Sequence, residues 1–117
     1  MSFSKRAYGS PVLRGARDTE YDVLSKITRM LHKAPKTCES AETISAVSKN
    51  GELWTIFAKD LVESNNGLPD EVKAGLLSLS GFVLRHGMLV LSGKGQTDIL
   101  IEINLSVMKG LRGGEEK

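Results

Sequence analysis

An apolar stripe in the middle of the chain constrains the fold more than any other feature of the sequence. Trp54, Phe57 and Leu61 recur at steps of three and four residues, a spacing that places their side chains on one face of a helix. Trp54 is the only tryptophan of the chain. We therefore predict that helices form the core and that this ring is buried between them.

The size and composition of the chain agree with one small domain. Its 117 residues are 40% apolar but only 5% aromatic, so the core should consist mostly of leucine, isoleucine and valine. No apolar run approaches the roughly 18 residues of a membrane span, and the N-terminus lacks the apolar stretch of a secretory signal. The single cysteine, Cys38, excludes an internal disulfide and is typical of a reducing compartment. We expect a cytoplasmic protein with no membrane span.

Four segments with helical periodicity follow one another and predict an all-α fold, a small four-helix antiparallel bundle. We expect a flexible N-terminal arm over residues 1–13, a helical domain over residues 14–112 and a frayed tail over residues 113–117. Asn50-Gly51 is a turn dipeptide that could break the second helix. The apolar stripe continues in phase through it, however, and this favours one long helix.

Residues 88–108 also fit a β-hairpin. Ile101, Ile103, Leu105 and Val107 alternate with polar residues, as in a half-buried strand. The apolar run 88–91 would then supply the partner strand. From the pattern alone, helix and hairpin are nearly level for this region.

The helical stripes also predict which side chains form the core. These residues are Tyr21, Leu24, Trp54, Phe57, Leu61, Leu76, Leu79, Val83 and Ile103.

Residue types that carry catalysis or bind metals are scattered along the chain. His32 and His86 have no carboxylate or cysteine at ligand spacing, so no zinc site is predicted. Gly93-x-Gly95 lacks the spacing of a phosphate-binding loop, and no base is visible for Cys38. We therefore expect no enzymatic activity, no metal and no cofactor.

Features of a protein-binding surface are stronger. Small residues at i, i+4 and i+7 could let another helix approach the third helix, although an internal helix could equally fill that space. The fourth helix is apolar on more than one face, and such a surplus is typical of a partner surface. We hypothesise a partner-binding groove between these two helices, lined by Ala74, Ser78, Gly81, Ile101, Leu105 and Met108.

The first third of the chain is basic. Lys26, Arg29, Lys33 and Lys36 could neutralise a few phosphates of a nucleic acid. No aromatic stacking residues accompany them, and the isoelectric point of about 8.8 is below that of strongly basic nucleic-acid binders. These observations argue against direct RNA binding.

Four short motifs stand in order along the chain: Arg17-Asp18-Thr19-Glu20-Tyr21, Leu53-Trp54-x-x-Phe57-x-x-Asp60-Leu61, Asn66-x-Leu68-Pro69 and Ile101-Glu102-Ile103-Asn104. In this order and at similar spacing they resemble the motifs of FlaF, a family of flagellar biosynthesis proteins of alphaproteobacteria. The likeness extends from about Tyr8 to Leu111. It implies a small helical protein, which favours helix over hairpin for residues 88–108, although family members look more plainly helical there.

The resemblance also implies a function. FlaF-like proteins are understood to act on flagellin as secretion chaperones and to support its synthesis and export, alongside the regulator FlbT. The predicted groove would then hold a terminal helical segment of flagellin through anchors at i, i+3, i+4 and i+7. The alternative is a post-transcriptional regulator that acts on flagellin messenger RNA, directly or through FlbT.

Overall fold

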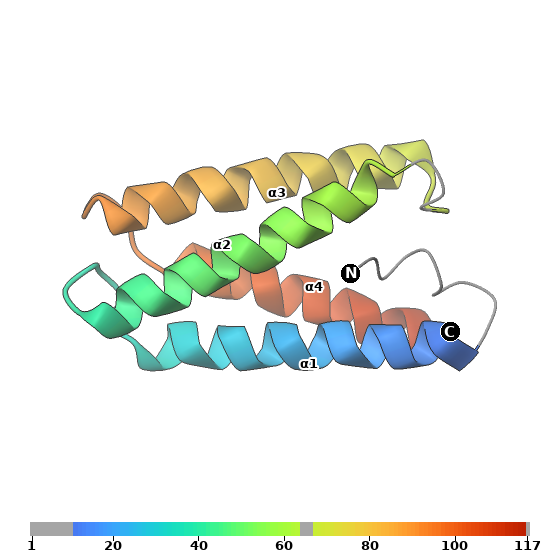
Figure 1. The fold of residues 1–117 in the computed structure, drawn as a ribbon, viewed down its shortest axis with the longest axis horizontal. Coiled ribbons are helices and arrows are strands. Elements are labelled where there is room, and N and C mark those ends of the chain that lie inside the picture. Colours follow the sequence, from blue (N-terminus) through green and yellow to red (C-terminus); the bar gives the residue numbers. More distant parts are fainter. Residues whose placement is uncertain (1–10, 64–66, 117) are drawn as a thin grey trace.

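The computed structural model describes the backbone of residues 11–63 and 67–116, and the side chains of residues 20–63 and 67–111. Over these residues the chain forms four helices and no strand. The helices are α1 Pro11–Lys33, α2 Ala41–Leu61, α3 Asp70–Leu91 and α4 Asp98–Glu116 (Figure 1). The predicted all-α, four-helix fold is confirmed.

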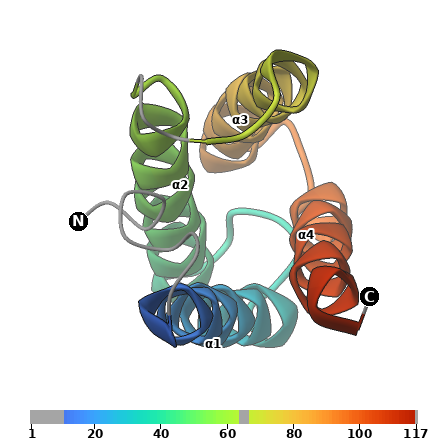
Figure 2. The same cartoon turned by 90° about the vertical axis from the view of Figure 1, so that its right-hand side faces the viewer.

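The helices occupy the four corners of the bundle in cross-section (Figure 2). α2 packs chiefly against α3, and α1 packs against both α2 and α4. α3 and α4 have the least contact of all neighbouring pairs; they approach each other near their connecting loop and then diverge (Figures 1 and 2). One side of the bundle is therefore more open than the others.

Cap residues explain where the helices begin and end. Pro11 opens α1, where its missing N–H costs nothing, so the helix begins three residues before the predicted Arg14. Ser40 caps α2, its hydroxyl accepting from the Thr43 backbone N–H at 3.3 Å. α3 ends where Gly93 adopts φ +83° and the Lys94 N–H donates to the Leu89 carbonyl at 2.8 Å.

The observed helices extend beyond the predicted bounds of the helical domain at both ends. Residues 1–10 of the predicted arm lie outside the described residues, whereas the last three residues of its range form the first turn of α1. The backbone of α4 continues past the predicted boundary at residue 112 as far as Glu116.

Two choices that the sequence left open are decided by burial. α2 runs unbroken through Asn50-Gly51, because Asn50 is buried and its side chain bonds to α4 rather than forming a turn. In α4 the most buried residues are Leu100, Asn104 and Met108, which recur at a helical step of four. The hairpin alternative for residues 88–108 is therefore excluded.

The core is centred on Trp54, which is 1% exposed. Its ring meets Phe57 edge to face at a centroid distance of 5.4 Å, a favourable aromatic geometry. Of the other residues on the predicted core stripes, Leu24, Leu61 and Val83 are buried. The half-buried ones are Tyr21, Phe57, Leu76, Leu79 and Ile103.

Candidate functional site

The six residues of the hypothesised groove between the third and fourth helices do not share one surface. On α3, Ala74 and Ser78 are exposed on the outside of the bundle. Gly81 is covered by its own helix neighbour, since a Cβ at this position would lie 3.1 Å from the Arg85 guanidinium. The stripe of small residues therefore receives no other helix of the bundle.

Two of the three residues of α4, Ile101 and Met108, lie beside α1. Met108 is buried and accepts a long hydrogen bond from the Thr28 hydroxyl of α1, at 3.9 Å from its sulfur. Ile101 lines a cavity with Leu31 of α1, and Leu105, half exposed, follows one turn later on the same flank. In this structure α4 docks on α1 with the flank that carries Ile101 and Met108, and helical periodicity does not specify which neighbour a flank meets. The groove between α3 and α4 stays a prediction.

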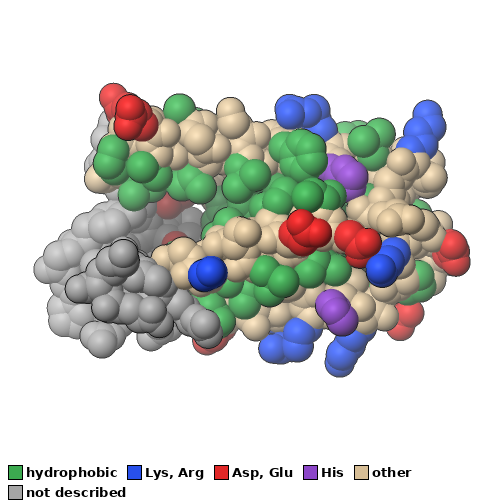
Figure 3. All heavy atoms as spheres, turned by 180° about the vertical axis from the view of Figure 1, so that it is seen from behind, with side chains coloured by type: hydrophobic (Ala, Val, Ile, Leu, Met, Phe, Trp, Pro, Cys, Tyr) green, Lys and Arg blue, Asp and Glu red, His purple; other side chains and the backbone are tan. Residues whose placement is uncertain are grey.

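Apolar surface is nevertheless present, and α3 carries much of it. Five of its large hydrophobic side chains are exposed: Val72, Phe82, Met88, Leu89 and Leu91. Hydrophobic side chains gather on the face formed by the α3 and α4 side of the bundle (Figure 3). The exposed apolar surface that the sequence predicts therefore lies mainly on α3 and not on α4.

The composition of α3 bears on the expectation of no membrane span. By length and composition alone this helix of 22 residues could cross a membrane, a property that core helices of soluble proteins share. Glycine and serine interrupt the apolar runs of α3, so no uninterrupted apolar run in it approaches 18 residues. Only 17% of its most apolar stretch is buried, so the helix presents apolar surface well beyond what the bundle covers.

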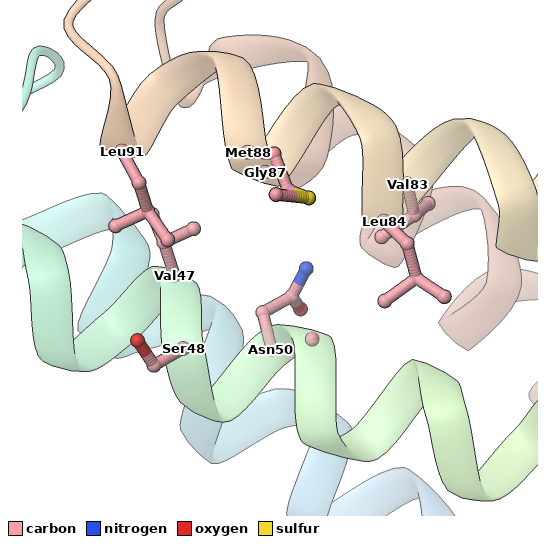
Figure 4. A pocket seen from close by; sticks show the side chains of 9 residues that line it. Val47, Ser48, Asn50, Val83, Leu84, Gly87, Met88 and Leu91 are labelled. Atoms are coloured by element: carbon pink, nitrogen blue, oxygen red, sulfur yellow. The ribbon is translucent and has the colours of Figure 1, made fainter.

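A pocket lies between α2 and α3, and two of the exposed residues of α3, Met88 and Leu91, line it (Figure 4). It has a volume of about 120 Å³. Its lining is mostly aliphatic, with Met88 and Leu91 at exposed positions of the rim and 71% of Met88 open to solvent. The residues that line it are Val47, Ser48, Asn50, Gly51, Val83, Leu84, Gly87, Met88 and Leu91. We call this site the α2/α3 pocket.

Two of the lining residues, Gly51 and Gly87, are glycines, and the absence of their side chains leaves space between α2 and α3. A Cβ at Gly87 would lie 3.4 Å from Val47, and one at Gly51 would lie 3.7 Å from Leu84. Glycine in the interior of a helix costs about 1 kcal/mol relative to alanine, so two of them facing one interface indicate a local need for space. This is the signal in the sequence that could have located the pocket.

A polar chain crosses the core and ends at the pocket. The Trp54 indole N–H donates to Asn104 Oδ1 at 2.9 Å, and Asn104 Nδ2 donates to Asn50 Oδ1 at 2.8 Å. Asn50 and Asn104 are both buried, and the Asn50 amide nitrogen points toward α3, into the pocket (Figure 4). Neither asparagine was predicted as a site residue. The signal in the sequence that could have indicated them is a polar residue on an otherwise apolar helical stripe.

A second cavity lies between α1 and α4 and has mixed polarity. Its volume is about 300 Å³, and its walls combine Leu31 and Ile101 with charged side chains. Lys36 bridges to Asp98 at 3.4 Å across its edge. The Thr97 hydroxyl, fully buried, has no hydrogen-bond partner among the described residues. Because both signs of charge line this cavity, it has no clear preference for one ligand.

Titratable side chains are dispersed over the described part of the chain. There, no group of three or more histidines, cysteines, aspartates or glutamates is close enough to hold a metal ion. His86 stacks on Phe82 at a centroid distance of 5.7 Å, and its Nε2 lies 2.8 Å from the Gln96 carbonyl oxygen. This histidine therefore helps to fix the loop between α3 and α4.

Comparison with known proteins identifies the family. Residues 5–111 match the family model described as flagellar protein FlaF. The chain belongs to the FlaF family. The match spans the residues of the α2/α3 pocket and of the polar chain behind it. No curated protein and no solved structure matches the sequence.

Proposed function

We propose that this FlaF-family protein binds flagellin in the cytoplasm as a secretion chaperone and thereby supports flagellin synthesis and export. The observation that carries the proposal is the exposed apolar surface around the α2/α3 pocket, where Met88 and Leu91 project from α3. Ile44, also exposed, lies one helical turn before Ser48 on α2 and extends this surface along the other wall. Membership of a family of flagellar proteins supports a flagellar client.

The physical basis of the proposal is the way an amphipathic helix is held in a groove. Such a helix places apolar anchors at i, i+3, i+4 and i+7 against a hydrophobic surface. A few buried contacts then supply most of the affinity. Met88 suits this role because its flexible thioether adapts to the shape of a bound side chain. A terminal helical segment of flagellin, held this way, would be kept from polymerising before export.

The proposal is tested by matched substitutions on two exposed surfaces. Met88→Asp places a charge at the rim of the α2/α3 pocket, and Leu105→Asp places the same charge on α4 at a residue that is 50% exposed. Binding of purified flagellin is measured by calorimetry, with circular dichroism as the check on folding. We expect Met88→Asp to weaken binding at least tenfold and Leu105→Asp to leave it within twofold.

The opposite pattern would place the flagellin site on α4, as the sequence first suggested. Absence of binding to wild type would remove the chaperone function. A pull-down from cells with and without FlbT tests whether the protein acts only through FlbT. In that case flagellin would co-purify with the protein from cells that contain FlbT and not from cells that lack it.

The rival function is direct binding of flagellin messenger RNA. One observation favours it: Lys26, Arg29, Lys33 and Lys36 are all exposed along α1 and its exit. Lys36 is partly engaged by Asp98. RNA held by these cations would dissociate steeply with added salt. If the flagellin leader RNA does not shift in a gel at low salt, this function is removed.

A further inference from the structure

The hydrogen bonds of the polar chain that ends at the α2/α3 pocket can be donated in only one direction, from Trp54 toward Asn50. An indole N–H can donate a hydrogen bond but cannot accept one. Asn104 must therefore turn its oxygen to Trp54 and its nitrogen to Asn50, which in turn must accept with its oxygen. The orientation of a buried amide is usually assigned from its neighbours; here Trp54 fixes both amides.

The consequence is a donor at the floor of the pocket. With its oxygen engaged by Asn104, Asn50 presents its Nδ2 group to the pocket (Figure 4). No backbone or side-chain group of the described residues accepts from this nitrogen. Among the described residues this nitrogen is not one of the enclosed polar atoms that lack a partner, so solvent reaches it through the open pocket. A guest that displaces this solvent must bring an acceptor of its own, because the donor would otherwise be left unsatisfied.

The rest of the lining decides which acceptor fits. None of the described residues that line the pocket is charged, so an entering carboxylate would lose its hydration without meeting a cation. An ammonium group would meet the Asn50 N–H groups, which repel it. A neutral carbonyl oxygen satisfies the donor without either cost, and the exposed Ser48 hydroxyl can accept from an amide N–H of the guest.

Size and depth narrow the choice further. A volume of about 120 Å³ is below the range of roughly 300–1,000 Å³ for small-molecule sites, and it suits a single side chain. Asn50 is 1% exposed, so a short serine or threonine on a docked helix would not reach it. The backbone carbonyls of such a helix are engaged in its own hydrogen bonds.

We propose that the α2/α3 pocket recognises a partner helix by one amide side chain, a glutamine or the shorter asparagine, set among aliphatic residues. The inference rests on the proposed function, because the partner is the flagellin segment that would lie along α3. The amide oxygen accepts from Asn50 Nδ2 and its aliphatic stem packs on Leu84 and Val47. Trp54, although it touches no partner, determines the specificity through Asn104.

The first experiment tests the chemistry of the pocket without flagellin. Protein labelled with ¹⁵N is titrated with butyramide, butyrate and butylamine, which share one stem and differ in the head group. We expect butyramide to shift the Asn50 side-chain NH₂ signals in a saturable manner, with an affinity at least tenfold above the other two. Equal responses to the three probes, or no response to butyramide, would overturn the inference.

The second experiment fills the pocket in the full chain. Gly51→Leu places an aliphatic side chain inside it, whereas Gly75→Leu adds the same atoms at an α3 position with nothing within 4 Å of its Cβ. We expect flagellin affinity to fall at least tenfold with Gly51→Leu and to stay within twofold with Gly75→Leu. Both should melt no lower than wild type, because leucine favours helix over glycine; if Gly51→Leu melts lower, Ser48→Leu at the rim takes its place.

The outcomes separate this inference from the proposed function. If wild type and the pocket-filling variant bind flagellin equally, the amide site is refuted while the chaperone function stands. If no variant binds flagellin but butyramide binds at Asn50, the chaperone function fails and the amide site stands for another helical partner. Loss of flagellin binding with Gly51→Leu together with butyramide selectivity supports both.

Discussion

Replacing Asn104 by leucine should destabilise the protein more than any other polar-to-apolar change in the described core. Asn104 is fully buried and is the only link between Trp54 and Asn50, with hydrogen bonds of 2.9 and 2.8 Å. Asn104→Leu keeps the branched shape and the number of side-chain heavy atoms, so the change removes hydrogen bonds without opening a cavity. Two buried polar atoms lose their partner at once.

The two orphaned atoms do not cost the same. The Trp54 N–H can only donate and is enclosed in the core, so it should carry the full penalty of about 1–3 kcal/mol. Asn50 can rotate its amide and turn the oxygen toward the pocket, which recovers part of its loss. We expect a total of about 2–4 kcal/mol, a large share of the 5–15 kcal/mol typical of a domain.

Urea unfolding followed by tryptophan fluorescence measures this loss. The chain has one tryptophan, so the signal reports Trp54 alone. The control is Trp54→Phe, made in wild type and in the Asn104→Leu background and followed by circular dichroism. Removing the indole N–H should cost at least about 1 kcal/mol less in the second background, because the orphaned donor disappears with it. An Asn104→Leu midpoint equal to that of wild type would refute the argument that this polar chain stabilises the core.

Three further changes test the core and the helix ends, each by the change in free energy of unfolding. Trp54→Ala should cost about 3–5 kcal/mol, as for large aromatics removed from cores; an unchanged midpoint would show that the ring does not support the bundle. Ser40→Ala should cost about 1 kcal/mol through loss of the α2 cap, and an effect below measurement would mean that the 3.3 Å bond to Thr43 contributes nothing. Gly93→Ala should destabilise by about 1 kcal/mol because its φ is +83°, whereas Gly75→Ala, in open space within α3, should stabilise by a similar amount; equal effects of the two would contradict this account of the α3 stop.

Most of the fold could be predicted because helix formation leaves a local record. The spacing of Trp54, Phe57 and Leu61 marks the buried face of α2, and Pro69 marks the start of α3. Where two local patterns competed, as in residues 88–108, the sequence alone could not choose. Packing of Leu100 against the core on one side of α4 decided for helix.

Local periodicity determined that this chain forms four amphipathic helices, that Trp54 is enclosed and that apolar surface is left over. It could not determine which flank of each helix meets which neighbour, because that depends on contacts between residues about fifty positions apart, such as Trp54 with Asn104. Because α4 docks on α1, Met108 is buried, and most of the exposed apolar surface lies on α3. The approach of α2 to α3 across two glycines then formed the pocket, and one indole N–H set its polarity. Only the tertiary structure decided the site, since its defining features are directions in space that no spacing along the chain records.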